Sequence, residues 1–84
     1  MSYRMPDAAV TAWLREQGVT AEDTFRFTVD RAASTIRVYQ YERDLSKERR
    51  FFIRYGEIAE RVPFTVSVET IPDFVEFDSY GKGE

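Results

Sequence analysis

Residues 24–30 read TFRFTVD, and residues 35–42 read TIRVYQYE. Apolar and polar side chains alternate along the first stretch, which predicts a half-buried strand with Phe25, Phe27 and Val29 on one face. The second stretch is rich in β-branched and aromatic residues, which are typical of strands. Because only a short turn separates the two stretches, they predict an antiparallel hairpin.

The second of these strands carries apolar side chains on both faces. Ile36 and Val38 share one face, while Arg37, Tyr39 and Tyr41 share the other. One face therefore supplies a core, and the other leaves aromatic rings on the side away from that core.

A helix is expected over residues 6–17, ahead of the hairpin. Proline and then Asp7 suit the first turn of a helix, and Gly18 suits its end. The apolar positions of this segment recur at a spacing of three and four residues, as on one face of a helix. They are Val10, Trp13 and Leu14.

Further strands are expected after the hairpin. The alternation predicts a third strand over residues 50–55, a fourth over residues 64–69 and a short fifth over residues 74–77. Residues 57–61 fit one helical turn or a piece of strand, and the pattern does not choose between them.

These elements predict an α+β fold. The N-terminal helix packs on one face of a four- to five-stranded antiparallel sheet, and the short connections favour a meander-like strand order. The length of 84 residues fits one domain, predicted over residues 1–78. Residues 79–84, which include two glycines, are expected to form a flexible tail.

The composition argues against catalysis. The chain has no histidine and no cysteine, the residues that most often serve as general base, nucleophile or transition-metal ligand. It also lacks the glycine-rich phosphate-binding motifs and the GxSxG motif. The acidic residues of the C-terminal third match no calcium-binding loop. We therefore expect no enzymatic activity, no cofactor and no metal site.

A basic and aromatic surface is the candidate site. Residues 26–54 carry eight basic and four acidic side chains, although the whole chain has a net charge of −3. Tyrosine and arginine are enriched at the centres of protein interfaces. The candidate residues are Arg37, Tyr39, Tyr41, Arg50, Phe52 and Arg54.

Two kinds of partner fit this surface. The first is a protein, either a foreign one or a second copy in a homodimer. The alternative is a single-stranded nucleic acid, because aromatic rings beside arginine can stack on bases and contact phosphates. The acidic total and the interleaved acidic residues favour the protein partner.

Residues 12–23, AWLREQGVTAED, are followed by the alternating hairpin. This arrangement, over about residues 8–42, resembles small uncharacterised accessory proteins of actinobacterial phages. The resemblance implies a protein made in the cytoplasm of a bacterial host that binds a host or phage protein or associates with itself. No run reaches the roughly 18 apolar residues of a membrane span, which agrees with that location and with no membrane partner.

Overall fold

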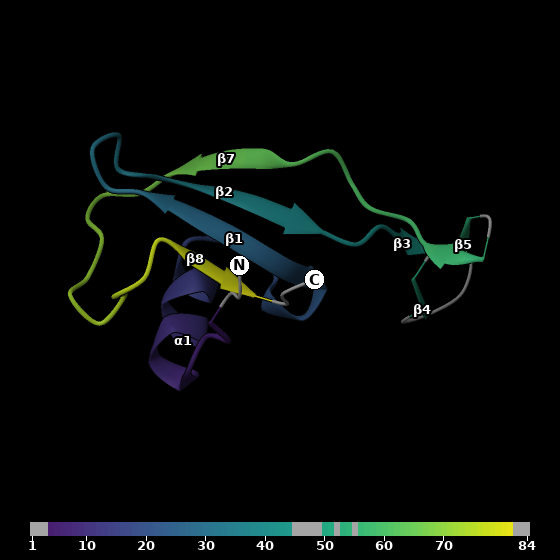
Figure 1. Ribbon diagram of the computed structural model, residues 1–84, viewed down its shortest axis with the longest axis horizontal. Coiled ribbons are helices and arrows are strands. Elements are labelled where there is room, and N and C mark those ends of the chain that lie inside the picture. The colour runs from purple at the N-terminus through teal and green to yellow at the C-terminus, as the bar shows by residue number, and fades with distance from the viewer. Residues whose placement is uncertain (1–3, 45–49, 52, 55, 82–84) are drawn as a thin grey trace.

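An α-helix packs against an antiparallel sheet in the computed structural model (Figure 1). The structure describes residues 4–44, 50–51, 53–54 and 56–81, and the side chains of residues 44, 50 and 54 are outside that description. Four strands form the main sheet in the order β7-β2-β1-β8. They are β1 (Thr24–Asp30), β2 (Thr35–Gln40), β7 (Phe64–Ser67) and β8 (Ser79–Gly81).

The predicted α+β architecture is confirmed. Within the sheet, β1, β2 and β7 lie side by side in the order in which they occur along the chain, as in a meander, and the pairings among the four strands are antiparallel. The fourth strand departs from a simple meander, because β8 returns to pair with β1. This is the strand order of a Greek key. We call the main sheet together with its helix the body.

The helix, α1, spans Ala8–Glu16. The carboxylate of Asp7 accepts a hydrogen bond of 2.9 Å from the backbone N–H of Val10, so this residue caps the helix rather than forming its first turn. Gly18 has a φ of 82°, and its left-handed conformation ends the segment. At nine residues, α1 is too short to cross a membrane, and the described part of the chain contains no helix that could.

The core lies between α1 and the sheet. β1 contributes Phe27 and Val29, and β2 contributes Ile36 and Val38, as the alternation predicts. The buried side chains are Val10, Trp13, Leu14, Val19, Phe27, Val29, Ile36, Val38, Val68, Val75 and Tyr80. Gln40 is also buried, and its side chain donates to the Thr24 hydroxyl and accepts from Arg61, at 3.1 and 3.0 Å. These hydrogen bonds satisfy its buried amide.

The C-terminal segment differs from the prediction. Ser79–Gly81, expected in the flexible tail, forms β8, and only residues 82–84 of that tail lie outside the description. Tyr80 is 3% exposed, and its ring stacks on Phe27 with a centroid distance of 5.1 Å. The packing of Tyr80 on Phe27 therefore holds residues 79–81 in the sheet. The glycines of this segment had led to the prediction of a flexible tail.

The short strand expected over residues 74–77 is also wrong. This segment begins within a turn, which is closed by a hydrogen bond of 3.0 Å from Val75 N–H to Pro72 O. The Val75 carbonyl then accepts a 2.5 Å hydrogen bond from the guanidinium of Arg31. The Arg31 side chain satisfies this carbonyl in place of a neighbouring strand. Val75 is therefore buried without joining the sheet.

The described residues between positions 41 and 61 form what we call the arm. The strand predicted over residues 50–55 is confirmed at residues 50–51 and 53–54, and residues 52 and 55 lie outside the description. These strands belong to two short ribbons rather than to the main sheet, in which β7 lies beside β2. The first ribbon pairs β3 (Arg43–Asp44) with β4 (Arg50–Phe51). The second pairs β5 (Ile53–Arg54) with β6 (Glu57–Ile58), and Glu60 forms a bridge with Tyr41, so this part of residues 57–61 pairs as strand rather than forming a helical turn.

The arm is a continuation of the body's sheet. Glu42 N–H donates to Ala59 O at 2.8 Å, and Arg61 N–H donates to Gln40 O at 2.9 Å. This pairing carries both strands of the ribbon past the end of the α1 layer (Figure 1). Between β2 and β7 the chain therefore extends away from the main sheet as the arm and then comes back to it. After this return, β7 pairs with β2.

Candidate interaction surface

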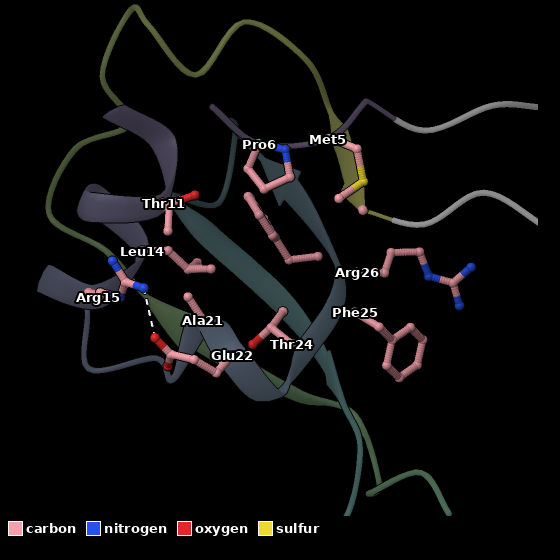
Figure 2. A pocket seen from close by; sticks show the side chains of 12 residues that line it. Met5, Pro6, Thr11, Leu14, Arg15, Ala21, Glu22, Thr24, Phe25 and Arg26 are labelled. Carbon is pink, nitrogen blue, oxygen red and sulfur yellow. Dashed lines mark hydrogen bonds and ion pairs between the residues drawn. The ribbon is translucent and has the colours of Figure 1, made fainter. Parts of the chain in front are cut away.

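A β-bulge at Phe25 shapes the sheet face that lies away from α1. Thr24 is opposite Gln40 and Arg26 is opposite Tyr39, so two steps along β1 match one step along β2. Phe25 is the extra residue, and such a bulge turns consecutive side chains toward the same side. The prediction that Phe25 shares a face with Phe27 is therefore wrong. Figure 2 shows the side chains of Phe25 and Arg26 projecting together, away from α1.

The bulge places Phe25 in a continuous line of four rings, which we call the aromatic row. Its ring stacks on Tyr41 with a centroid distance of 4.5 Å and lies 6.3 Å from the ring of Tyr39. Tyr41 meets the ring of Phe51 edge-on at 5.4 Å. All four rings are half-buried, so each keeps part of its surface in contact with solvent. Aromatic pairs at these separations each add about 0.5–1.5 kcal/mol beyond their buried area.

A backbone hydrogen bond holds the centre of the row in place. Tyr41 N–H donates to the carbonyl of Asp23 at 3.0 Å. Asp23 ends η1 (Ala21–Asp23), the short 3₁₀ helix that enters β1. The row is therefore anchored to the body at the point where the arm begins.

Three arginines lie over rings of the row. The guanidinium carbon of Arg26 is 4.5 Å from the ring centre of Tyr39, and that of Arg37 is 6.0 Å from the same ring. The guanidinium carbon of Arg43 is 4.7 Å from the ring centre of Phe51. Each such cation–π contact contributes about 0.5–1 kcal/mol near the surface.

Acidic neighbours offset part of this positive charge. Arg43 Nε donates to the Asp23 carboxylate at 2.7 Å, and this hydrogen bond raises the pKa of Arg43 above its ordinary value. Arg15 pairs with Glu22 at 2.7 Å on the neighbouring η1 segment. One of the three arginines over the row, Arg43, is thus paired with a carboxylate, which reduces the positive charge of this surface.

The predicted surface residues fall into two groups. Arg37, Tyr39 and Tyr41 lie together, as expected. Phe52 and the side chains of Arg50 and Arg54 lie outside the described part of the chain.

Four members of the surface were not in the predicted set. Alternation places Phe51 on the face of its strand opposite to Phe52, so the pattern did not include it in the surface. Alternation also places Phe25 on the core face, because its strand alternates without a break. Of the remaining two, Arg26 lies opposite Tyr39 in the regular part of the hairpin, and Arg43 is placed by the arm.

A pocket of about 230 Å³ lies on the other side of β1, between that strand, η1 and α1 (Figure 2). Its wall is largely apolar and includes Met5, Leu14, Ala21 and Phe27. The Arg15–Glu22 ion pair lies on its rim. No group of acidic residues within the described ranges is arranged to hold a metal ion.

Comparison of the chain with protein families, curated proteins and solved structures finds no match. Any function assigned to the chain therefore depends on the aromatic row and the pocket themselves.

Proposed function

We propose that this protein is a non-enzymatic accessory protein that binds another protein through the aromatic row. The observation that carries the proposal is the contact of four half-exposed rings on a sheet face that α1 does not cover. The resemblance to accessory proteins of actinobacterial phages supports a partner from the host or the phage, in the host cytoplasm.

The packing within the row favours tight binding. The ring of Phe25 already contacts the rings of Tyr39 and Tyr41, and Arg26 already lies over Tyr39. Side chains held in place before binding lose little conformational entropy when a partner arrives. Tyrosine and arginine are also the residues whose truncation most often weakens protein complexes.

Single-stranded nucleic acid is the second candidate. Rings and guanidinium groups on one sheet face can stack on bases and contact phosphates. The charge balance makes this the weaker proposal, because Arg43 is paired with Asp23 and the chain has a net charge of −3. Binding driven by phosphate contacts weakens steeply as salt is added.

The test compares capture of bacterial proteins by immobilised wild type and by Tyr39→Ala. The proposal predicts a protein that binds the wild type and is lost from Tyr39→Ala. Thr28→Ala is the matched control, because Thr28 lies on the same face, opposite Arg37, but contributes no ring to the row. Tyr39→Phe keeps the ring and should keep most of the binding.

Equal capture by the wild type and by a folded Tyr39→Ala variant would overturn the proposal. An oligothymidylate probe tests the second candidate in parallel. Tight binding of this probe that falls steeply with salt and is lost in Tyr39→Ala would replace the protein partner by a nucleic acid.

A further inference from the structure

β7 forms an open edge of the main sheet. It pairs with β2 on one side, and within the described part of the chain no strand pairs with it on the other side (Figure 1). Val68 N–H donates to Ser34 O at 2.9 Å, on the β2 side. Because the backbone groups of successive residues in a paired strand point to alternate sides, those of Thr65 and Ser67 point to the open side. Each of these two residues offers one N–H and one C=O to a further strand.

The side chains of this edge do not oppose the approach of a further strand. Natural edge strands are commonly protected by charged side chains or by bulges. Residues 62–68 read VPFTVSV and carry no charge. The pairing of β7 with β2 also runs without a bulge. β7 therefore has the chemistry of a strand that accepts another strand at its edge.

The opposite edge of the sheet, at β8, is already covered. Gly81 N–H donates to Arg4 O at 2.7 Å, and Arg4 forms a parallel bridge with Tyr80. A second copy that approached β8 would first have to displace this segment. Two copies therefore cannot join β7 to β8 without losing these contacts, and the contact left for two open edges is β7 against β7.

We propose that two copies of this protein pair their β7 strands antiparallel about a two-fold axis at Val66, which joins the two main sheets into one. Thr65 of each copy then lies opposite Ser67 of the other, and the open N–H and C=O groups of both residues are paired. Because both outer edges of the joined sheet are covered β8 strands, the assembly closes as a dimer. This contact is separate from the proposed function, which depends on the aromatic row.

The side chains match in this arrangement. Residues directly opposite each other in an antiparallel pair lie on the same face of the sheet. On the core face, Phe64 lies opposite Val68 of the second copy and the two Val66 side chains meet, and both Phe64 and Val66 already pack against the core. On the other face, the exposed side chains of Thr65 and Ser67 meet. Pairs of aromatic with β-branched residues and of threonine with serine both stabilise a sheet.

Pro63 and the end of β7 favour this register over its neighbours. A slip of two residues in one direction would place Pro63 opposite Ser67, and proline has no N–H to donate. A slip of two residues in the other direction would place Thr65 opposite Glu69, which lies beyond the end of β7 at Ser67. A slip of one residue would place core-side residues opposite outward-facing ones.

Light scattering over a range of protein concentrations tests the contact, with Thr65→Pro and Thr65→Ala as a matched pair. The wild type should rise from its monomer mass of 9.9 kDa to twice that mass and no further. Thr65→Pro removes an N–H that points away from β2, which an edge strand tolerates, and should raise the dissociation constant at least about tenfold. Thr65→Ala keeps this N–H and should raise it less than about threefold. Circular dichroism checks that both variants fold.

Cross-linking reports the register directly. The two Val66 residues face each other without backbone hydrogen bonds between them, and the Cα atoms of such a pair lie about 4.5 Å apart. This separation suits a disulfide, and the chain has no cysteine of its own. Val66→Cys should therefore form a disulfide-linked dimer far more readily than Val62→Cys. Val62 is the control because it is 86% exposed but lies away from the proposed two-fold axis.

A wild type that stays monomeric at every concentration would overturn the inference. So would an oligomer that a folded Thr65→Pro variant weakens no more than Thr65→Ala does, or a Val66→Cys disulfide that does not exceed the Val62→Cys control. If Thr65→Pro does not fold, the cysteine variants decide alone. None of these results affects the aromatic row, whose test is the separate loss of capture in Tyr39→Ala.

Discussion

The body and the arm contain similar alternating strands, yet they differ in what covers their apolar side chains. Ile36 in β2 is fully buried between the sheet and α1, whereas Ile53 in β5 is 58% exposed. Both residues sit in paired strands and face a cross-strand apolar neighbour, Val66 for the first and Ile58 for the second. The comparison teaches that strand pairing alone buries little, and that a second layer creates a core.

The strongest test of this comparison truncates one isoleucine in each region. Ile36→Ala should lower the free energy of unfolding by about 4 kcal/mol, because it leaves a cavity in a closed core. Ile53→Ala should lower it by less than about 0.5 kcal/mol in dilute monomer, because water already reaches that side chain. Urea unfolding followed by circular dichroism measures both, and equal losses would break the comparison.

Glycines in the two regions provide the next test. Gly81 in β8 has a φ of 129°, and a Cβ atom there would stand 2.2 Å from the Phe25 carbonyl oxygen. Gly81→Ala should therefore destabilise the body by about 3 kcal/mol.

Gly56 in the arm is the matched control. Its φ of 79° also disfavours alanine, but a Cβ atom there meets nothing within 4 Å. Gly56→Ala should cost only about 1 kcal/mol, from the left-handed backbone alone. Thermal unfolding of the two variants distinguishes the crowded position from the open one, and a larger loss at Gly56 would contradict the assignment.

The helix cap gives a smaller effect that should be confined to the body. Asp7→Ala removes the acceptor for Val10 N–H and should lower stability by about 1 kcal/mol. Asp7→Asn keeps an oxygen acceptor and should restore most of the loss. Hydrogen exchange should show faster opening of α1 with unchanged exchange in the arm, and a change in the arm alone would argue against this division.

The smallest effect concerns pH. A hydrogen bond from its own backbone N–H and then the Arg15 guanidinium lower the pKa of Glu22 below its ordinary value. The folded state therefore gains stability from this carboxylate above the ordinary glutamate pKa and loses it as pH falls through the lowered value. A carbon-detected NMR titration should give a midpoint below the usual glutamate range, and Arg15→Gln should move that midpoint upward.

The elements whose buried faces follow a local repeat of apolar residues could be predicted from sequence. The helix stripe of Val10, Trp13 and Leu14 and the inner faces of β1 and β2 depend on local periodicity, and the structure confirms them. β8 could not be predicted in this way, because Tyr80 is buried only through its contact with Phe27 far away in the chain.

The residues of the candidate surface also divide into those that local alternation predicts and those that it does not. Arg37, Tyr39 and Tyr41 follow from alternation in one strand. Phe25 joins them only through a bulge, which is a property of how two strands pair rather than of either strand alone. The arm also depends on how strands pair. The pattern over residues 50–55 predicts strands correctly but does not show which strands they pair with.

The pairing of β8 with β1 has a consequence for how the protein is made. Phe27 and Tyr80 are about fifty positions apart, so a ribosome completes β1 well before its edge partner exists. During that interval one edge of β1 and the ring of Phe27 have no β8 to cover them, and such surfaces favour aggregation. The hairpin of β1 and β2 can form during synthesis, but the sheet can close only after residues 79–81 have been translated.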